Sequence, residues 1–189
     1  MKREPSNCAR LLALNLLQEY DGHISTKFLS GTVNHLGLGD FDACSPFSGL
    51  HSASFFGIVE VVAALIEMEC RDIGGGDFWG YTPLTWAASN GHGEVMEIIL
   101  GREGVNLDRP DNFGRTPFSR AAGHGHEEAV KMLLGREEVS PDKPDNEGQT
   151  PLSYAARGGH GEVVKILLVR EEVNPDKPDI YDRTSLSSP

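Results

Sequence analysis

The chain has 189 residues, of which 39% are hydrophobic and 24% are charged, as expected for one or two folded soluble domains. Its formal net charge of −11 argues against nucleic acid as a partner, because phosphate binding requires a basic face. Its three cysteines are too few and too widely spaced for a disulfide framework or a zinc motif, and no apolar run reaches the roughly 20 residues of a membrane span.

The first part of the chain predicts helices. Leucines concentrate between residues 11 and 17, which indicates a buried helix over 7–20, and 24–36 could form a second one. Neither segment shares the pattern that fills the rest of the chain. We therefore treat 1–47 as a separate region.

From residue 48 onward the sequence repeats itself with a step of 34 residues. The tripeptide that begins at Thr82 recurs at Thr116 and at Thr150, and the Gly-His pair at 91–92 recurs with the same step. Between 114–147 and 148–181, 22 of 34 positions are identical. The predicted organisation is a 1–47 region, a divergent repeat 48–79, full repeats 80–113, 114–147 and 148–181, and a partial repeat 182–189.

Each repeat predicts two short helices and a loop. Thr82 is a suitable N-cap, and Pro83 fits the first turn of a helix. The second helix carries apolar residues at i, i+3 and i+4, as in Val95, Ile98 and Ile99. The Pro-Asp segments that follow cannot continue a helix. One repeat cannot bury its apolar stripe alone, whereas stacked repeats can. Helix pairs are expected near 48–70, 82–101, 116–135 and 150–169.

These residues resemble the ankyrin repeat, whose signature is Thr-Pro-Leu-His-x-Ala-Ala, then Gly-His and an aliphatic second helix. The resemblance implies an all-α solenoid of stacked helix-turn-helix units with extended loops or β-turn fingers, in which 1–47 is a helical N-terminal cap or a degenerate repeat. The chain departs from the signature, because the histidine is kept only at His51 and hydroxyl residues replace it elsewhere. The Asn-Pro-Asp-Lys-Pro-Asp segment at 174–179 is similar to segments in the ankyrin arrays of filamentous-fungal multidomain proteins.

No pattern indicates a catalytic, metal or cofactor site. His92, His126 and His160 occur once per repeat, where the family has a histidine, and we interpret them as structural. The Gly74–Gly76 run lacks the Lys-Ser/Thr of a phosphate loop. Most of the paired glutamates are expected on a solvated face.

The resemblance places the residues beside the finger glycine, and those that end helix one, on the concave face. Exposed Trp, Tyr and Arg side chains are typical of binding hot spots, although Phe78 and Trp79 could instead pack on a neighbour. Trp86 is expected to pack, and for Phe55 and Phe56 both roles stay open. The candidate partner-binding residues are Phe78, Trp79, Tyr81, Ser89, Asn90, Asn112, Phe113, Arg115, His124, Gln149, Arg157 and Tyr181.

The function predicted first is a monomeric, cytoplasmic scaffold that binds another protein through this concave finger/helix-one face. One alternative is an enzyme or small-ligand-binding protein with a pocket between the N-terminal region and the first repeats. Another is a structural fragment of a longer array. Because the chain is acidic, its rim is expected to favour a partner with Lys or Arg around an apolar centre. No cofactor, nucleic acid or membrane partner is expected.

Overall fold

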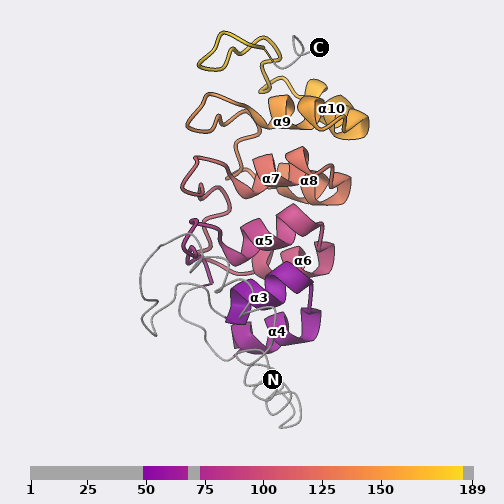
Figure 1. Cartoon of the computed structure of the whole chain (residues 1–189). Coiled ribbons are helices and arrows are strands. Elements are labelled where there is room, and N and C mark those ends of the chain that lie inside the picture. The colour runs from indigo at the N-terminus through magenta and orange to yellow at the C-terminus, as the bar shows by residue number, and fades with distance from the viewer. Residues whose placement is uncertain (1–48, 68–72, 185–189) are drawn as a thin grey trace.

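The computed structural model describes residues 49–67 and 73–184. Within these ranges the regular structure is entirely helical, and the helices follow one another as pairs. The pairs stack into an elongated column with the loops projecting from one side (Figure 1). The expected all-α repeat solenoid is confirmed, whereas the helices expected within 1–47 lie outside the described residues.

In each pair a first helix of seven or eight residues is followed by a second of eight or nine. These bounds agree with the helix pairs expected from the repeat. The pairs are α3 Gly49–Phe56 with α4 Val59–Glu67, α5 Pro83–Asn90 with α6 Gly93–Leu100, α7 Pro117–Gly123 with α8 Glu127–Leu134, and α9 Pro151–Arg157 with α10 Gly161–Leu168.

The helices α5, α7 and α9 begin at the threonines predicted as N-caps. The Thr82 hydroxyl accepts the Thr85 N–H at 3.1 Å, and the Thr85 hydroxyl in turn accepts the Thr82 N–H at 3.3 Å. Thr150 and Ser153 form the same reciprocal capping box at the start of α9. A hydroxyl in place of the signature histidine therefore satisfies a backbone donor at the helix start. The retained His51 instead bonds the Gly75 carbonyl oxygen through Nε2, at 3.0 Å.

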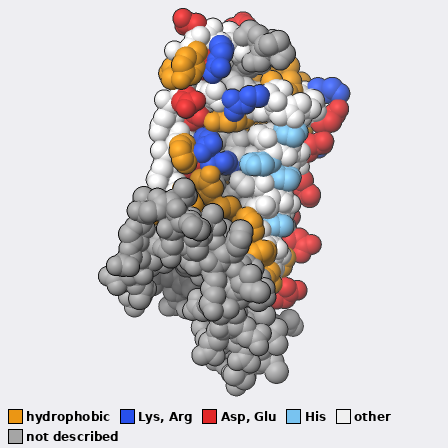
Figure 2. All heavy atoms as spheres, viewed as in Figure 1, with side chains coloured by type: hydrophobic (Ala, Val, Ile, Leu, Met, Phe, Trp, Pro, Cys, Tyr) orange, Lys and Arg blue, Asp and Glu red, His pale blue; other side chains and the backbone are white. Residues whose placement is uncertain are grey.

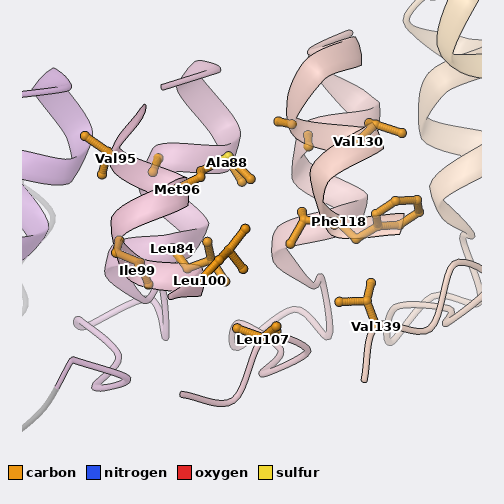
Figure 3. Close-up of a cluster of buried hydrophobic side chains, with 14 of the residues drawn as sticks. Leu84, Ala88, Val95, Met96, Ile99, Leu100, Leu107, Phe118, Val130 and Val139 are labelled. Carbon is orange, nitrogen blue, oxygen red and sulfur yellow. The ribbon is translucent and has the colours of Figure 1, made fainter. Parts of the chain in front are cut away.

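The hydrophobic core runs along the stack and is shared between neighbouring repeats. In α6 the fully buried residues are Val95, Met96 and Ile99, whereas Ile98 is only partly buried. Ile98 packs against this core at its edge, so the predicted stripe faces the core. Because α6 packs against α4, α5 and α8, its apolar arc also includes Met96. Figure 3 shows this core between two repeats, where the labelled side chains are Leu84, Ala88, Val95, Met96, Ile99, Leu100, Leu107, Phe118, Val130 and Val139.

A histidine precedes each of α6, α8 and α10 and connects its repeat to the one before. His126 Nε2 donates to the Ser89 carbonyl oxygen at 2.9 Å, and His92 and His160 bond Phe55 and Gly123 in the same way. The His126 ring lies over Gly91, whose φ is 71°, and a Cβ at Gly91 would come within 2.6 Å of Nδ1. This contact supports the structural interpretation of these histidines.

This packing makes folding stability sensitive to mild acid. Burial lowers the pKa of His126 below its ordinary 6.5, and the nearby His124, His160 and His92 lower it further. The unfolded chain then binds this proton more readily than the folded chain, so stability falls as the pH drops below 6.5 towards the lowered pKa. We expect a lower urea midpoint at about pH 5.5 than at about pH 7.5.

Replacing His126 with glutamine isolates this contribution, because the amide can still donate to the Ser89 carbonyl but does not titrate. The difference between the two midpoints should be smaller in His126→Gln than in the parent chain. An equal difference in both proteins would contradict the assignment.

Hydrogen bonds and ion pairs also connect successive Pro-Asp loops. The Lys143 ammonium group donates to the Asp108 carbonyl oxygen at 3.0 Å and to its carboxylate at 2.7 Å, one repeat earlier. Lys177 makes the same two bonds to Asp142. These loops therefore stack in register with the helices.

Candidate functional site

Each repeat is preceded by a tight turn, here called a finger, that a single aspartate organises. The Asp77 carboxylate accepts the N–H groups of Trp79 and Tyr81 through Oδ1, both at 2.9 Å. The Gly80 N–H donates to the Asp77 carbonyl oxygen at 2.8 Å, which closes a β-turn. Gly80 has φ of 80°, a conformation that favours glycine. The expected β-turn fingers are therefore present.

The same aspartate connects the finger to the first helix of its repeat. Its Oδ2 accepts a hydrogen bond from the side chain nine residues later, which is Trp86, Arg120 or Tyr154 in successive repeats. The aspartates were not among the predicted site residues. Their recurrence at the 34-residue step was the signal that could have revealed them, and they are Asp77, Asp111, Asp145 and Asp179.

Hydrogen bonds also join each finger to the next. The Asn112 N–H donates to the Trp79 carbonyl oxygen at 2.9 Å, and the Asn146 N–H donates to that of Phe113 at 3.0 Å. The Asn112 side-chain amide adds a bond to the Phe78 carbonyl oxygen at 2.9 Å. These hydrogen bonds hold neighbouring fingers at a fixed spacing, and the exposed side chains project from this hydrogen-bonded backbone.

Aromatic rings link the first finger to the first helices. Tyr81 packs on Trp86 with ring centroids 4.8 Å apart, and the Phe55 ring lies 5.1 Å from that of Trp86. Trp79 lies 6.4 Å from Tyr81 and 5.9 Å from Phe78. Trp86 packs as predicted, with its indole N–H bonded to Asp77. We call this group the aromatic cluster, and it consists of Phe55, Phe56, Phe78, Trp79, Tyr81 and Trp86.

Arginines continue this surface into the second full repeat. The Arg120 guanidinium lies 4.4 Å over the Tyr81 ring, bonds the Tyr81 hydroxyl and donates to the Asp111 carboxylate at 2.7 Å. Arg115 lies 4.4 Å over Phe113, with its Nε 3.3 Å from the same carboxylate. Burial raises the pKa of Asp111 above its ordinary value, and the bonds from Arg115 and Phe113 oppose that rise. Arg120 was not predicted as a site residue.

In the third full repeat a tyrosine takes the place of Arg120. Tyr154 donates its hydroxyl hydrogen to Asp145, and the Arg157 guanidinium lies 4.9 Å from its ring centroid. Burial raises the pKa of Tyr154 to about 12, and the bond to Asp145 and the charge of that carboxylate act in the same direction. Tyr154 therefore stays protonated and remains a donor at neutral pH.

The predicted site residues differ in how much surface they offer. Phe113 and Tyr181 are 50% and 63% exposed, and Phe78, Asn112, His124 and Arg157 are also exposed. Gln149, in contrast, is only 6% exposed and has little surface for a partner. The half-buried members are Trp79, Tyr81, Ser89, Asn90 and Arg115.

We call the surface made by the fingers and by α3, α5, α7 and α9 the finger/helix-one face. Figure 2 shows hydrophobic, Lys/Arg and His side chains gathered over the middle of the view, with many Asp and Glu side chains along one edge. Exposed glutamates of the second helices include Glu94, Glu97, Glu127, Glu128 and Glu162.

Among residues 49–67 and 73–184, no three His, Cys, Asp or Glu side chains are grouped so that they could hold a metal ion. The stacked rings of His124 and His126 have centroids 6.2 Å apart. None of the described helices combines the length and the apolar composition needed to cross a membrane.

The comparison with protein-family models gives a match to ankyrin repeats, in three copies, over residues 20–111 and 100–179. The chain belongs to the ankyrin-repeat family. Ankyrin repeats generally mediate protein–protein interaction. The comparison with curated proteins found no match, so no relative supports the finer resemblance to filamentous-fungal ankyrin arrays.

Proposed function

We propose that this ankyrin-repeat chain is a protein-binding scaffold whose finger/helix-one face recognises another protein. The observation that carries the proposal is the exposure of Phe113 and Tyr181 at one equivalent position of their fingers, where the first full repeat has the half-buried Trp79. Large exposed aromatic side chains are typical of surfaces that a partner covers. Within this proposal the chain acts as a monomer in the cytoplasm.

The finger backbone that carries these side chains is ordered by hydrogen bonds, which favours binding. The aspartate turns and the finger-to-finger bonds hold the backbone before any partner arrives. Arg115 stacked on Phe113 further restricts that ring. A surface ordered in advance loses less conformational entropy on association, so more of the contact energy contributes to affinity.

The two alternative functions draw no support from the described residues. A pocket between 1–47 and the first repeats would involve residues outside those ranges. A purely structural array has no use for exposed aromatic rings on successive fingers. The protein-binding function therefore accounts best for the finger/helix-one face.

The aromatic finger residues are expected to contribute most to recognition. Trp79→Ala and Phe113→Ala should each weaken partner binding by about 1–3 kcal/mol, because each removes a large ring from the centre of the face. Affinity capture with the intact chain, quantified by mass spectrometry, should lose the same proteins with both variants. Affinities for a captured protein can then be measured with each purified variant.

Val169→Ala is the matched control, because Val169 is a highly exposed apolar residue just after α10, away from the fingers. It should leave the captured set unchanged. Equal capture by all three variants would refute this binding face. If Trp79→Ala unfolds the first repeat while Phe113→Ala binds normally, the Trp79 ring has a packing role and not a binding role.

A further inference from the structure

The finger/helix-one face has a different charge from the protein as a whole. Three arginines from separate elements lie over aromatic rings of this face: Arg115 from a finger over Phe113, Arg120 from α7 over Tyr81, and Arg157 at the end of α9 over Tyr154. A chain with a net charge of −11 thus presents a group of guanidinium ions on one face.

The finger aspartates close to these arginines are already engaged. Asp111 is fully buried and serves both Arg115 and Arg120. Asp145 accepts the Tyr154 hydroxyl and the N–H groups of Glu147 and Gln149.

Arg157 differs from the other two. Its side chain is exposed, and no carboxylate of the described residues lies within salt-bridge distance of it. The Tyr154 ring supports the guanidinium group, which leaves its N–H donors open to a ligand.

The negative charge lies largely elsewhere. Glu94, Glu127, Glu128 and Glu162 are in the first turns of the second helices, and many acidic side chains follow one edge in Figure 2. An acidic rim that selects Lys or Arg was expected from the net charge. Arg115 and Arg157, however, lie over the Phe113 and Tyr154 rings, and the chemistry of the partner is inferred from this local arrangement.

We propose that the finger/helix-one face binds an acidic segment of the partner, with an Asp or Glu carboxylate on Arg157 and an apolar side chain against Phe113. This inference rests on the proposed function and adds the chemical class of the partner. A guanidinium group pairs with a carboxylate through two parallel N–H donors. An arginine stacked on a ring is pre-ordered for that contact, so less side-chain entropy is lost.

The experiment selects ligands for the full-length chain from a random peptide library displayed on phage. We expect the selected peptides to be enriched in Asp and Glu beside aromatic or aliphatic residues. Arg157→Gln should weaken the binding of a selected acidic peptide about tenfold, because it removes a charge-assisted pair. The affinity of the parent chain should also fall as salt is raised.

Arg136→Gln is the control, because it changes the net charge equally at an exposed residue in the loop after α8. It should leave peptide affinity nearly unchanged, and the thermal midpoints of both variants should match that of the parent.

Neutral or basic peptides that need Phe113 but not Arg157 would overturn the acidic-partner inference while leaving the proposed binding face intact. Peptides whose binding depends on neither residue, or the absence of any selected peptide, would count against both. Equal losses in Arg157→Gln and Arg136→Gln would mean that only net charge matters, which also overturns the inference.

Discussion

Replacing Leu133 with alanine is expected to lower the free energy of unfolding by about 2–4 kcal/mol. Leu133 is fully buried in α8, which packs against α6, α7 and α10. The substitution removes apolar atoms from a core shared by three repeats. Because hydrogen bonds from His126 and His160 hold the neighbouring repeats in place, the cavity can collapse only in part.

Urea unfolding of the parent chain and of Leu133→Ala measures the difference in their free energies of unfolding. Glu138→Ala provides the comparison within the same repeat, because Glu138 is exposed and has no assigned contact. Its effect should stay within about 0.5 kcal/mol. Equal losses in Leu133→Ala and Glu138→Ala would contradict the assignment of the core.

Asp111→Ala should cost a similar amount, about 2–4 kcal/mol, although no apolar surface is lost. The substitution leaves the Phe113 and Arg115 N–H groups without their acceptor. It also removes the carboxylate that pairs with Arg120, whose side chain is only 13% exposed. A charge at that depth is costly when it is unpaired.

Urea unfolding of the double variant Asp111→Ala/Arg120→Met separates the loss of the N–H acceptor from the cost of the unpaired Arg120 charge. Removing the guanidinium group as well should recover part of the loss, because no unpaired charge remains below the surface. Asp176→Ala, at an exposed loop aspartate that bonds only the Asn174 amide oxygen through its own N–H, should have little effect. An Asp111→Ala loss as small as that of Asp176→Ala would show that the finger does not depend on its carboxylate.

Several features of the fold followed from the sequence because their causes are local. Thr82 and Thr150 start helices through contacts with residues three positions later. The 34-residue step gave the number and order of the helix pairs, since equivalent residues adopt equivalent structure in each repeat. The histidines were assigned a structural role because they occur once per repeat where the ankyrin family has a histidine, whereas their carbonyl partners lie one repeat away.

The candidate site was only partly predictable. The positions beside the finger glycines were correctly associated with exposed rings at Phe113 and Tyr181. The same positional argument included Gln149, which is the repeat equivalent of the half-buried Arg115 but is itself buried. Position within a repeat therefore locates the finger but does not determine how neighbouring side chains cover each other.

The sequence by itself determined the repeat, the helix pairs, the caps and the general position of the fingers, because these depend on short-range contacts and on periodicity. Only the tertiary structure decided the character of the finger/helix-one face. Arg120 meets Tyr81 across 39 positions of the chain, and Asn112 bonds the Phe78 carbonyl oxygen across 34. Net charge is a sum over all residues, whereas a partner responds to the charges that stacking brings together on one face.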